Sequence, residues 1–261
     1  MIETKLKMMV IRTFLMFYYY SFLFLVLGSN FDLIFKRQSS KDMVLLPDGQ
    51  NIPSMTGFTI AQFVQADSKY KSGTLFSYSV PENPEDIIIL SFTESQIILA
   101  IKNEEVRADF RLADDNWHFV GVIWDGGLGS ASVYIDGMEI AEVSNLQAEN
   151  IIRGGGWIAL GQRYLAEQKI TALSSEFVGR LHQVSIWNVA ATRDHMWNAA
   201  HDCSWPIAGS LGAWSSFLPG IKGQVEKRFM TQCKGIKYLS NSNQKSIFFT
   251  DVYRWYTFPR T

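Results

Sequence analysis

The segment 117–140, which reads WHFVGVIWDGGLGSASVYIDGMEI, restricts the fold more than any other part of the chain. Residues 118–124 are apolar at both sets of alternating positions, which is typical of a central strand covered on both faces. The glycine-rich run 125–129 turns the chain back, because glycine adopts positive φ at little steric cost. Asp136-Gly137 then separates two strand-like runs and predicts a type I′ hairpin. The segment therefore predicts the middle of an antiparallel sheet.

Similar runs of β-favouring residues recur along the body of the chain, with Gly, Pro and Asp at the joints between them. They predict an all-β fold, built as a two-sheet antiparallel β-sandwich. One short helix is predicted near 192–200, where Thr192 can cap the first turn. Residues 81–86 are predicted to be a polar loop, because its two prolines lack the N–H that a strand ladder needs. Besides the central hairpin, strands are expected at 43–46, 58–64, 74–80, 87–92, 96–101, 106–112, 157–161 and 177–187.

The composition suits one large β-sandwich, although the length also allows two small domains. Of the 261 residues, 47% are hydrophobic and 14% are aromatic, which is enough for a substantial core. The net charge of −1 gives no reason to expect nucleic acid or an anionic membrane surface as a partner. Two cysteines are too few for a small fold that disulfides hold together.

The N-terminus has the three parts of a secretory signal. Residues 1–12 are basic, residues 13–27 are almost wholly apolar, and Gly28 ends the run with a small residue. The apolar run is shorter than the roughly 20 residues that span a membrane comfortably. We therefore predict a signal peptide at 1–28, a secreted or extracellular location, and no membrane span after cleavage. An uncleaved signal-anchor is the alternative, because the tyrosines at 18–20 are less apolar than usual for a signal peptide.

Trp117, His118 and Trp124, followed by a glycine turn and the run VYIDG at 133–137, resemble the signature hairpin of pentraxin domains. These domains belong to the wider group of laminin-G-like and lectin-like jelly rolls, so the resemblance implies a jelly-roll sandwich. Four weaker matches occur in the order and spacing that the family shows, at 73–78, 158–162, 177–187 and 214–225. The last of them is similar to the closing strands of the family.

The resemblance also sets the expected domain organisation. It covers residues 41–234, which we expect to form one pentraxin-like β-sandwich domain. Residues 29–40 are then expected to be a linker between the signal and the domain. Residues 235–261 match no part of the family pattern and are left as an unassigned C-terminal tail.

The resemblance implies that one disulfide of the family is lost here and that another is kept. Family members usually bridge two facing strands, and the corresponding positions here are Ala61 and Gly121, so cysteine is missing from both. We expect these two small residues to face each other across the core. Cys203 and Cys233 are implied to form a second bridge, similar to that of the modular and neuronal pentraxin domains. Two unpaired buried cysteines are the alternative.

The resemblance raises the question whether this chain binds calcium. Pentraxin domains typically hold two Ca²⁺ ions on one face, and Ca²⁺ prefers six to eight oxygen ligands. The implied ligand positions fall at 84–85, at 163–165 and near Ala172 and Ser175, where few oxygens are available and Arg163 adds a cation. No cofactor is therefore expected, and these segments are interpreted as solvated polar loops. A shifted calcium site is the alternative, and its ligands would be Glu85, Asp86, Glu167 and Gln168.

Enzymatic activity is not expected. Jelly-roll glycosidases need two carboxylates that face a cleft, and their strand signature Glu-x-Asp-x-x-Glu is absent. Glu104, Glu105, Asp114 and Asp115 fall at predicted turns and are interpreted as solvated charges. His118 is interpreted as a structural histidine on the central strand. The sequence also lacks a Gly-x-Ser-x-Gly nucleophile motif and a zinc-binding helix motif.

The predicted function is therefore recognition. We expect an extracellular, non-enzymatic module that binds a glycan, a phospholipid or a protein through its surface loops, as in ligand binding or cell adhesion. The alternative is a structural or protein–protein interaction domain within a larger extracellular protein or adhesion receptor. Family members form rings, so the resemblance also allows a homo-oligomer.

Overall fold

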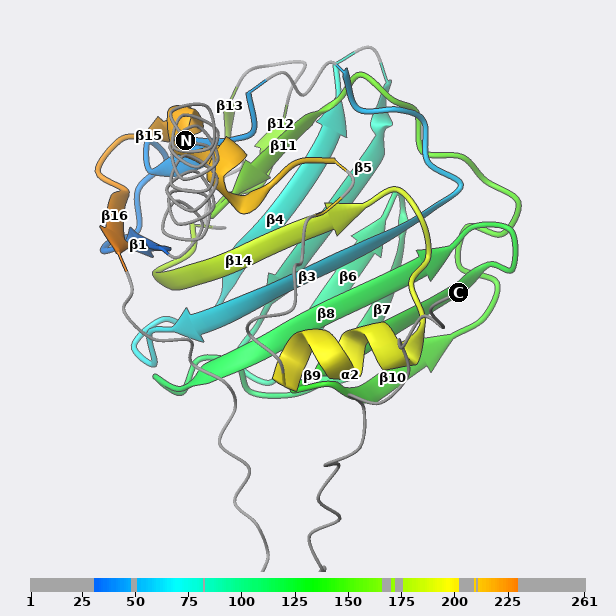
Figure 1. Cartoon of the computed structure of the whole chain (residues 1–261), viewed down its shortest axis with the longest axis horizontal. Helices are drawn as coiled ribbons and strands as arrows, with labels where there is room; N and C mark the ends of the chain where they lie inside the picture. Colours follow the sequence, from blue (N-terminus) through cyan, green and yellow to red (C-terminus); the bar gives the residue numbers. More distant parts are fainter. Residues whose placement is uncertain are drawn as a thin grey trace, which may run out of the picture.

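The apolar runs pair into two antiparallel sheets that pack face to face (Figure 1). The computed structural model describes residues 31–47, 51–81, 83–165, 170–171, 176–201, 209 and 211–229. Within these residues each sheet has seven strands. The order is β10-β9-β8-β3-β14-β1-β16 in the first sheet and β15-β2-β11-β4-β5-β6-β7 in the second.

The first sheet contains, in that order, β10 (Met138–Val143), β9 (Ser130–Ile135), β8 (Trp117–Asp125), β3 (Gly57–Ala66), β14 (Gly179–Trp187), β1 (Phe31–Phe35) and β16 (Glu226–Phe229). The second contains β15 (Ile221–Lys222), β2 (Met43–Leu45), β11 (Trp157–Leu160), β4 (Gly73–Val80), β5 (Asn83–Phe92), β6 (Gln96–Ile101) and β7 (Glu104–Asp109). The remaining elements are the small hairpin β12 (Tyr164–Leu165) and β13 (Ile170–Thr171), the helix α2 (Arg193–His201) and the 3₁₀ helix η2 (Trp214–Gly220).

The main core lies between the two sheets and is built from their inward-facing apolar side chains. Trp124 of the central strand β8 is fully buried there, and its Nε1 donates to the Leu146 carbonyl over 3.0 Å. The one polar atom of this large side chain is thus satisfied. The rings of Phe31 and Trp214 stack with centroids 4.7 Å apart, which joins β1 to η2. This ring pair holds η2 against the first sheet.

Helix α2 covers the outer face of the first sheet, where Figure 1 shows it lying over the end that carries β8, β9 and β10. Its buried stripe is Met196, Ala199 and Ala200, the i, i+3, i+4 spacing of one helix face. The Oγ1 of Thr192 accepts from the His195 N–H over 3.4 Å, so the predicted cap is confirmed. Among the described residues no helix is long and apolar enough to cross a bilayer.

The prediction of an all-β, two-sheet antiparallel sandwich is confirmed, and the helix predicted near 192–200 is α2. The hairpin at the centre of the sequence is confirmed as well. Asp136 and Gly137 have φ values of 54° and 82°, the positive values that a type I′ turn requires.

The prediction of a linker at 29–40 is wrong for Phe31–Phe35, which form β1. All five residues of this strand are buried, and it pairs with β14 on one side and β16 on the other. Asp32 interrupts the apolar run and a charged segment follows it, so the sequence pattern is too short to indicate a strand. Only pairing with strands from the other end of the chain makes the segment regular.

The polar loop predicted at 81–86 is also wrong in part, because β5 begins at Asn83, the partner of Val80. A register irregularity separates this pair from the regular β4–β5 ladder, and Pro84 lies within it. Strand β6 pairs with β5 only from Ile88 onward. The missing N–H of Pro84 therefore breaks no ladder hydrogen bond.

The segment 214–225 was expected to supply closing strands, and most of it does not. Trp214–Gly220 forms η2, with Pro219 inside it, and only Ile221–Lys222 forms a strand. The buried rings of Trp214 and Phe217 hold this 3₁₀ helix against the core.

Candidate functional site

The segment after β11 lies on the outer face of the second sheet, and two serines of β4 hold it there. Side chains alternate along a strand, so Ser77 and Ser79 point outward while Phe76 faces the core. The Ser77 hydroxyl donates to the Gln162 carbonyl over 2.8 Å and accepts from the Tyr164 N–H over 3.1 Å. The Ser79 hydroxyl donates to the Tyr164 carbonyl over 2.9 Å. Residues 162–164 are thus fixed to the sheet.

Gln162 joins this segment to the connection between β1 and β2. Its side chain is fully buried, and Nε2 donates to the carbonyl of Asp42 over 3.0 Å and to that of Ser39. The buried carboxylate of Asp42 accepts from Arg37 Nε over 3.1 Å and from the Gln224 N–H over 2.8 Å. Three distant parts of the chain are therefore tied together at this corner of the sheet.

Tyr164 and Arg163 occupy positions that the pentraxin resemblance assigns to metal ligands. The Tyr164 ring is buried against Met43, Leu45 and other apolar side chains of the outer face. This burial raises the pKa of the Tyr164 hydroxyl, which therefore keeps its proton at neutral pH. Arg163 is exposed and brings a positive charge. Neither residue offers the carboxylate that a calcium ion prefers.

Among the residues that the structure describes, the other candidate calcium ligands do not form a cluster. Glu85 is exposed on β5, and Asp86 follows it on the same strand. Glu167 and Gln168, like Ala172 and Ser175, lie outside the described residues. Within the described part of the chain, no three His, Cys, Asp or Glu residues are placed to hold a metal ion. The shifted calcium site therefore stays a prediction.

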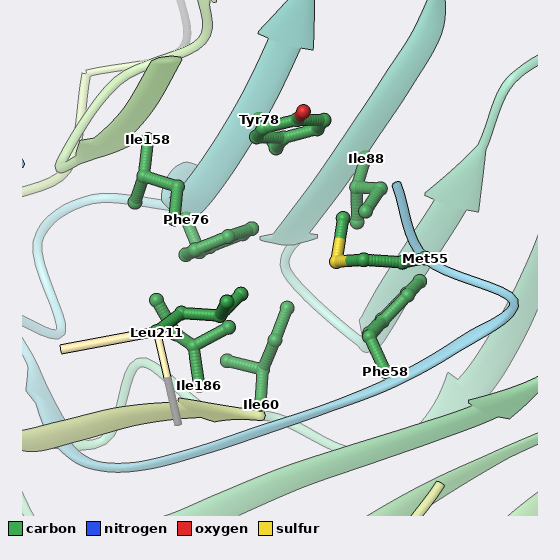
Figure 2. A pocket seen from close by; sticks show the side chains of 9 residues that line it. All are labelled: Met55, Phe58, Ile60, Phe76, Tyr78, Ile88, Ile158, Ile186 and Leu211. Atoms are coloured by element: carbon green, nitrogen blue, oxygen red, sulfur yellow. The ribbon is translucent and has the colours of Figure 1, made fainter. Parts of the chain in front are cut away.

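A small cavity lies in the core between the sheets, and Figure 2 shows the nine side chains that line it. Its volume is about 10 Å³, close to that of a single water molecule. The lining is apolar except for the Tyr78 hydroxyl, which donates to the Arg153 carbonyl and accepts from the Gly156 N–H. A buried water needs two or more polar partners, so this cavity is a packing defect and no ligand site.

Ala61 and Gly121 are register partners on the adjacent strands β3 and β8. The expectation that they face each other across the core is wrong: they lie side by side in one sheet, on the face that α2 covers. A Cβ built on Gly121 would lie 2.7 Å from Met196 Sδ and 3.0 Å from the Phe119 ring. The thioether of Met196 thus fills the space above this pair. Cys203 and Cys233 lie outside the described residues, so their bridge stays a prediction.

The acidic residues that were interpreted as solvated charges hold other groups in place. Glu104 accepts from the Gln147 N–H over 2.9 Å, and Glu105 pairs with Arg107 at 2.6 Å. Asp115 accepts from the N–H and the hydroxyl of Ser68 over 3.0 and 2.6 Å.

The remaining acid of this set belongs to a cluster with a histidine. Asp114 and Asp136 flank the ring of His118, at 3.3 Å from Nε2 and 2.9 Å from Nδ1. The interpretation of His118 as a structural histidine fits this geometry.

The sequence did not indicate three of these arrangements. They are the serine anchor, by which Ser77 and Ser79 hold residues 162–164, the hydrogen bonds around Asp42, and the carboxylates around His118. The anchor left one signal, the alternation Phe-Ser-Tyr-Ser in the strand at 76–79, which places two hydroxyls on the same outer face. The other two bring together residues that lie far apart in the sequence, and no local pattern indicates them.

A two-sheet antiparallel sandwich is an architecture that lectin domains use. A family model described as the concanavalin A-like lectin/glucanases superfamily matches residues 38–196, more than half of the chain. The chain belongs to this superfamily, within its laminin-G-like and pentraxin branch.

Curated relatives of the chain are pentraxins. Neuronal pentraxin-1 of Rattus norvegicus is 25% identical over 209 residues, which cover 80% of this chain and 48% of the relative. The neuronal pentraxin receptor of Mus musculus is 29% identical over 185 residues, covering 70% of this chain and 37% of the relative. The chain thus spans about half the length, or less, of these proteins.

Solved structures show the same fold. The heptameric SAP-like pentraxin of Limulus polyphemus superposes with a TM-score of 0.68 at 17% identity, covering 79% of this chain and 98% of that one. The extracellular region of zebrafish Gpr126/Adgrg6 gives a TM-score of 0.61 at 15% identity, covering 79% of this chain and 27% of that one.

Proposed function

We propose that the protein is an extracellular, non-enzymatic recognition module that binds its ligand without the calcium pair typical of pentraxin domains. The observation that carries the proposal is the segment 162–164, which Ser77 and Ser79 fix to the outer face of the second sheet. A rigid surface loop binds with a smaller loss of conformational entropy than a mobile one. The segment presents Arg163 to solvent, and a guanidinium group suits carboxylate, phosphate or sulfate groups.

Binding to glycan and phospholipid arrays, with Ca²⁺ and with chelator, tests this proposal. We expect binding to anionic members of the arrays that persists in chelator and that Arg163→Ala weakens. Arg153→Ala is a control for general loss of positive charge, because Arg153 lies in a different loop. Binding that disappears in chelator would contradict a calcium-free mode.

A thermal scan gives a second readout for calcium. A specific ion at 100 times its Kd would stabilise the protein by about 2.7 kcal/mol. We expect no change in Tm between millimolar Ca²⁺ and chelator. A clear rise with Ca²⁺ would favour the shifted site of Glu85, Asp86, Glu167 and Gln168. Alanine variants of these four residues, which remove the ligand oxygens one side chain at a time, would then identify the ligands.

The second candidate function is a structural or protein–protein interaction domain of a larger extracellular protein. It is favoured by the small share of several relatives that the chain covers, such as 27% of the Gpr126/Adgrg6 extracellular region. A protein ligand found by extracellular interaction screening, together with arrays that show no binding, would favour this alternative over the first proposal.

Four further parts of the proposal concern processing and assembly. Residues 1–28 act as a secretory signal, Cys203 and Cys233 form a disulfide, residues 235–261 are a tail outside the domain, and the domain can form a homo-oligomer. Secretion of the expressed chain together with N-terminal sequencing tests the signal, non-reducing mass analysis tests the disulfide, and light scattering tests the homo-oligomer. Retention of the intact N-terminus in membranes would favour the signal-anchor.

A further inference from the structure

His118 lies between two carboxylates that come from different loops. Its Nδ1 is 2.9 Å from Asp136 Oδ2, and its Nε2 is 3.3 Å from Asp114 Oδ2. Asp136 belongs to the turn between β9 and β10, and Asp114 belongs to the loop between β7 and β8. The side chain of His118 is only 14% exposed, so water screens these contacts poorly. The ring therefore links two loops of the same rim.

Only the protonated ring can satisfy both contacts. A neutral imidazole has one N–H donor, whereas the imidazolium has two. Both carboxylates accept hydrogen bonds, so a neutral ring would turn a nitrogen lone pair toward one of them. The arrangement therefore fits a charged His118.

The two contacts are not equally secure. Asp136 is also held by the Phe119 N–H, which donates to its Oδ1 over 2.8 Å, and its own N–H donates to the Phe119 carbonyl over 2.9 Å. Among the described residues, the side chain of Asp114 has two hydrogen bonds besides the one to His118. Both are local, and they come from the N–H and the side-chain amide of Asn116, at 2.9 and 3.0 Å. Loss of the ring proton would therefore leave the Asp136 contact in place and break the one to Asp114.

We propose that Asp114, His118 and Asp136 form a pH-sensitive latch, which fastens the β7–β8 loop to the β9–β10 turn in mildly acidic solution and releases it as the pH rises. The neighbouring β3–β4 turn is coupled to the same loop, because Asp115 accepts from Ser68. The latch thus regulates the mobility of one rim of the sandwich.

The electrostatics of the cluster agree with this assignment. Burial of the ring opposes its charge, but the hydrogen bonds and charges of Asp136 and Asp114 outweigh burial and raise the pKa of His118 above 6.5. For Asp114, partial burial likewise acts upward, but the hydrogen bonds from Asn116 and His118 lower its pKa below 3.8.

The sign of the pH dependence follows from these two shifts. A raised histidine pKa contributes stability at pH values below about 6.5, and this stability is lost as the pH rises through the folded-state pKa. A lowered aspartate pKa contributes stability above about 3.9, and this stability is lost as the pH falls through the folded-state pKa. The latch is therefore tightest in mildly acidic solution, between these limits.

The other neighbours of the ring that the structure describes include apolar side chains and one further acid. On β3 the register partner of His118 is Val64, and the Phe110 ring packs edge-on with centroids 4.9 Å apart. Asp115 adds negative charge beside Asp114. His201 on α2 lies beside Gly137, next to Asp136. Further along β10, Glu139 accepts from the Tyr134 hydroxyl and pairs with Arg193.

Proton NMR of the full-length protein, together with amide hydrogen exchange between pH 5 and 9, tests the latch. We expect His118 to titrate above 6.5. We also expect the exchange protection of the Asn116 amide, corrected for intrinsic rates, to fall about tenfold across that titration, as the loss of one charge-assisted hydrogen bond implies.

Two variants and a control make the result specific. In Asp114→Asn the midpoint of His118 should fall and the step in Asn116 protection should disappear, and His118→Gln should also abolish the step. His195→Gln, which changes an exposed histidine of α2, should behave like the unmodified protein. A His118 midpoint at or below 6.5, or an unchanged step in Asp114→Asn, would overturn the latch. The titration of the unmodified protein decides the matter even if a variant does not fold.

Discussion

At the scale of the single residue, Gln62 is a polar side chain in apolar surroundings. It lies on β3 between Ile60 and Val64, whose side chains belong to the core between the sheets, and its register partner is Val120. Gln62 is fully buried, and within the described part of the chain neither its amide nitrogen nor its amide oxygen has a hydrogen-bond partner. A buried amide without partners costs about 1–3 kcal/mol.

We therefore expect Gln62→Met to stabilise the protein by about 1–2 kcal/mol, because methionine has a similar shape and no polar group that needs a partner. Urea unfolding followed by tryptophan fluorescence measures the change in the free energy of unfolding. Gln65→Met is the matched control on the same strand: Gln65 Nε2 donates to the Asp115 carbonyl over 2.7 Å, so this change should not stabilise. Destabilisation by Gln62→Met would mean that the amide has a partner in solution.

At the scale of the element, the attachment of the segment after β11 depends on one hydroxyl more than on any other. Ser77 is fully buried and bonds both to the Gln162 carbonyl and to the Tyr164 N–H. Ser77→Ala would leave two backbone groups unpaired, at a cost of about 1–3 kcal/mol. We expect a lower urea midpoint and faster amide exchange at Tyr164. Ser91→Ala, on the neighbouring strand β5, should change neither, and equal effects of both variants would argue against the anchor.

The pairing of β3 with β8 makes a second prediction at this scale. Register partners on adjacent antiparallel strands have Cα atoms about 4.5–5.5 Å apart, within the range that a disulfide bridges. Ala61→Cys with Gly121→Cys should therefore give a disulfide on non-reducing mass analysis, with Met196→Ala added to provide space. The closed loop of about 60 residues would stabilise by about 4 kcal/mol in the chain-entropy model. Two free thiols in the folded protein would show that the register is wrong.

At the scale of the whole molecule, the first sheet depends on β1, which precedes residues 41–234, the region that resembles pentraxin domains. Strand β1 lies between β14 and β16, and Phe31, Leu33 and Phe35 are almost completely buried. Each such side chain contributes roughly 1.5–3 kcal/mol by burial, and a whole domain is stable by only about 5–15 kcal/mol. The domain therefore starts earlier than residue 41.

A chain that begins at residue 41 is expected to lose cooperative unfolding, because it lacks β1, whereas a chain that begins at Ser29 should keep it. Near-ultraviolet circular dichroism and a urea titration distinguish the two. The same sharp transition in both chains would show that β1 is dispensable.

The sequence by itself determined the elements whose signals are local. The strands of the central hairpin, the turn at Asp136-Gly137 and the cap at Thr192 each depend on alternation or turn chemistry within a few residues. These signals, with the order of the pentraxin-like motifs, were sufficient for the two-sheet fold and the family.

Only the tertiary structure decided the contacts between distant segments. It made a strand of Phe31–Phe35, placed Ala61 beside Gly121 under α2, attached Tyr164 to Ser77, and set His118 between two loops. Such contacts depend on how the sheets twist and pack. The local sequence around a residue does not indicate which distant residue it will contact. The fold was therefore predictable from the residues in order, whereas the surroundings of each candidate site residue required the folded chain.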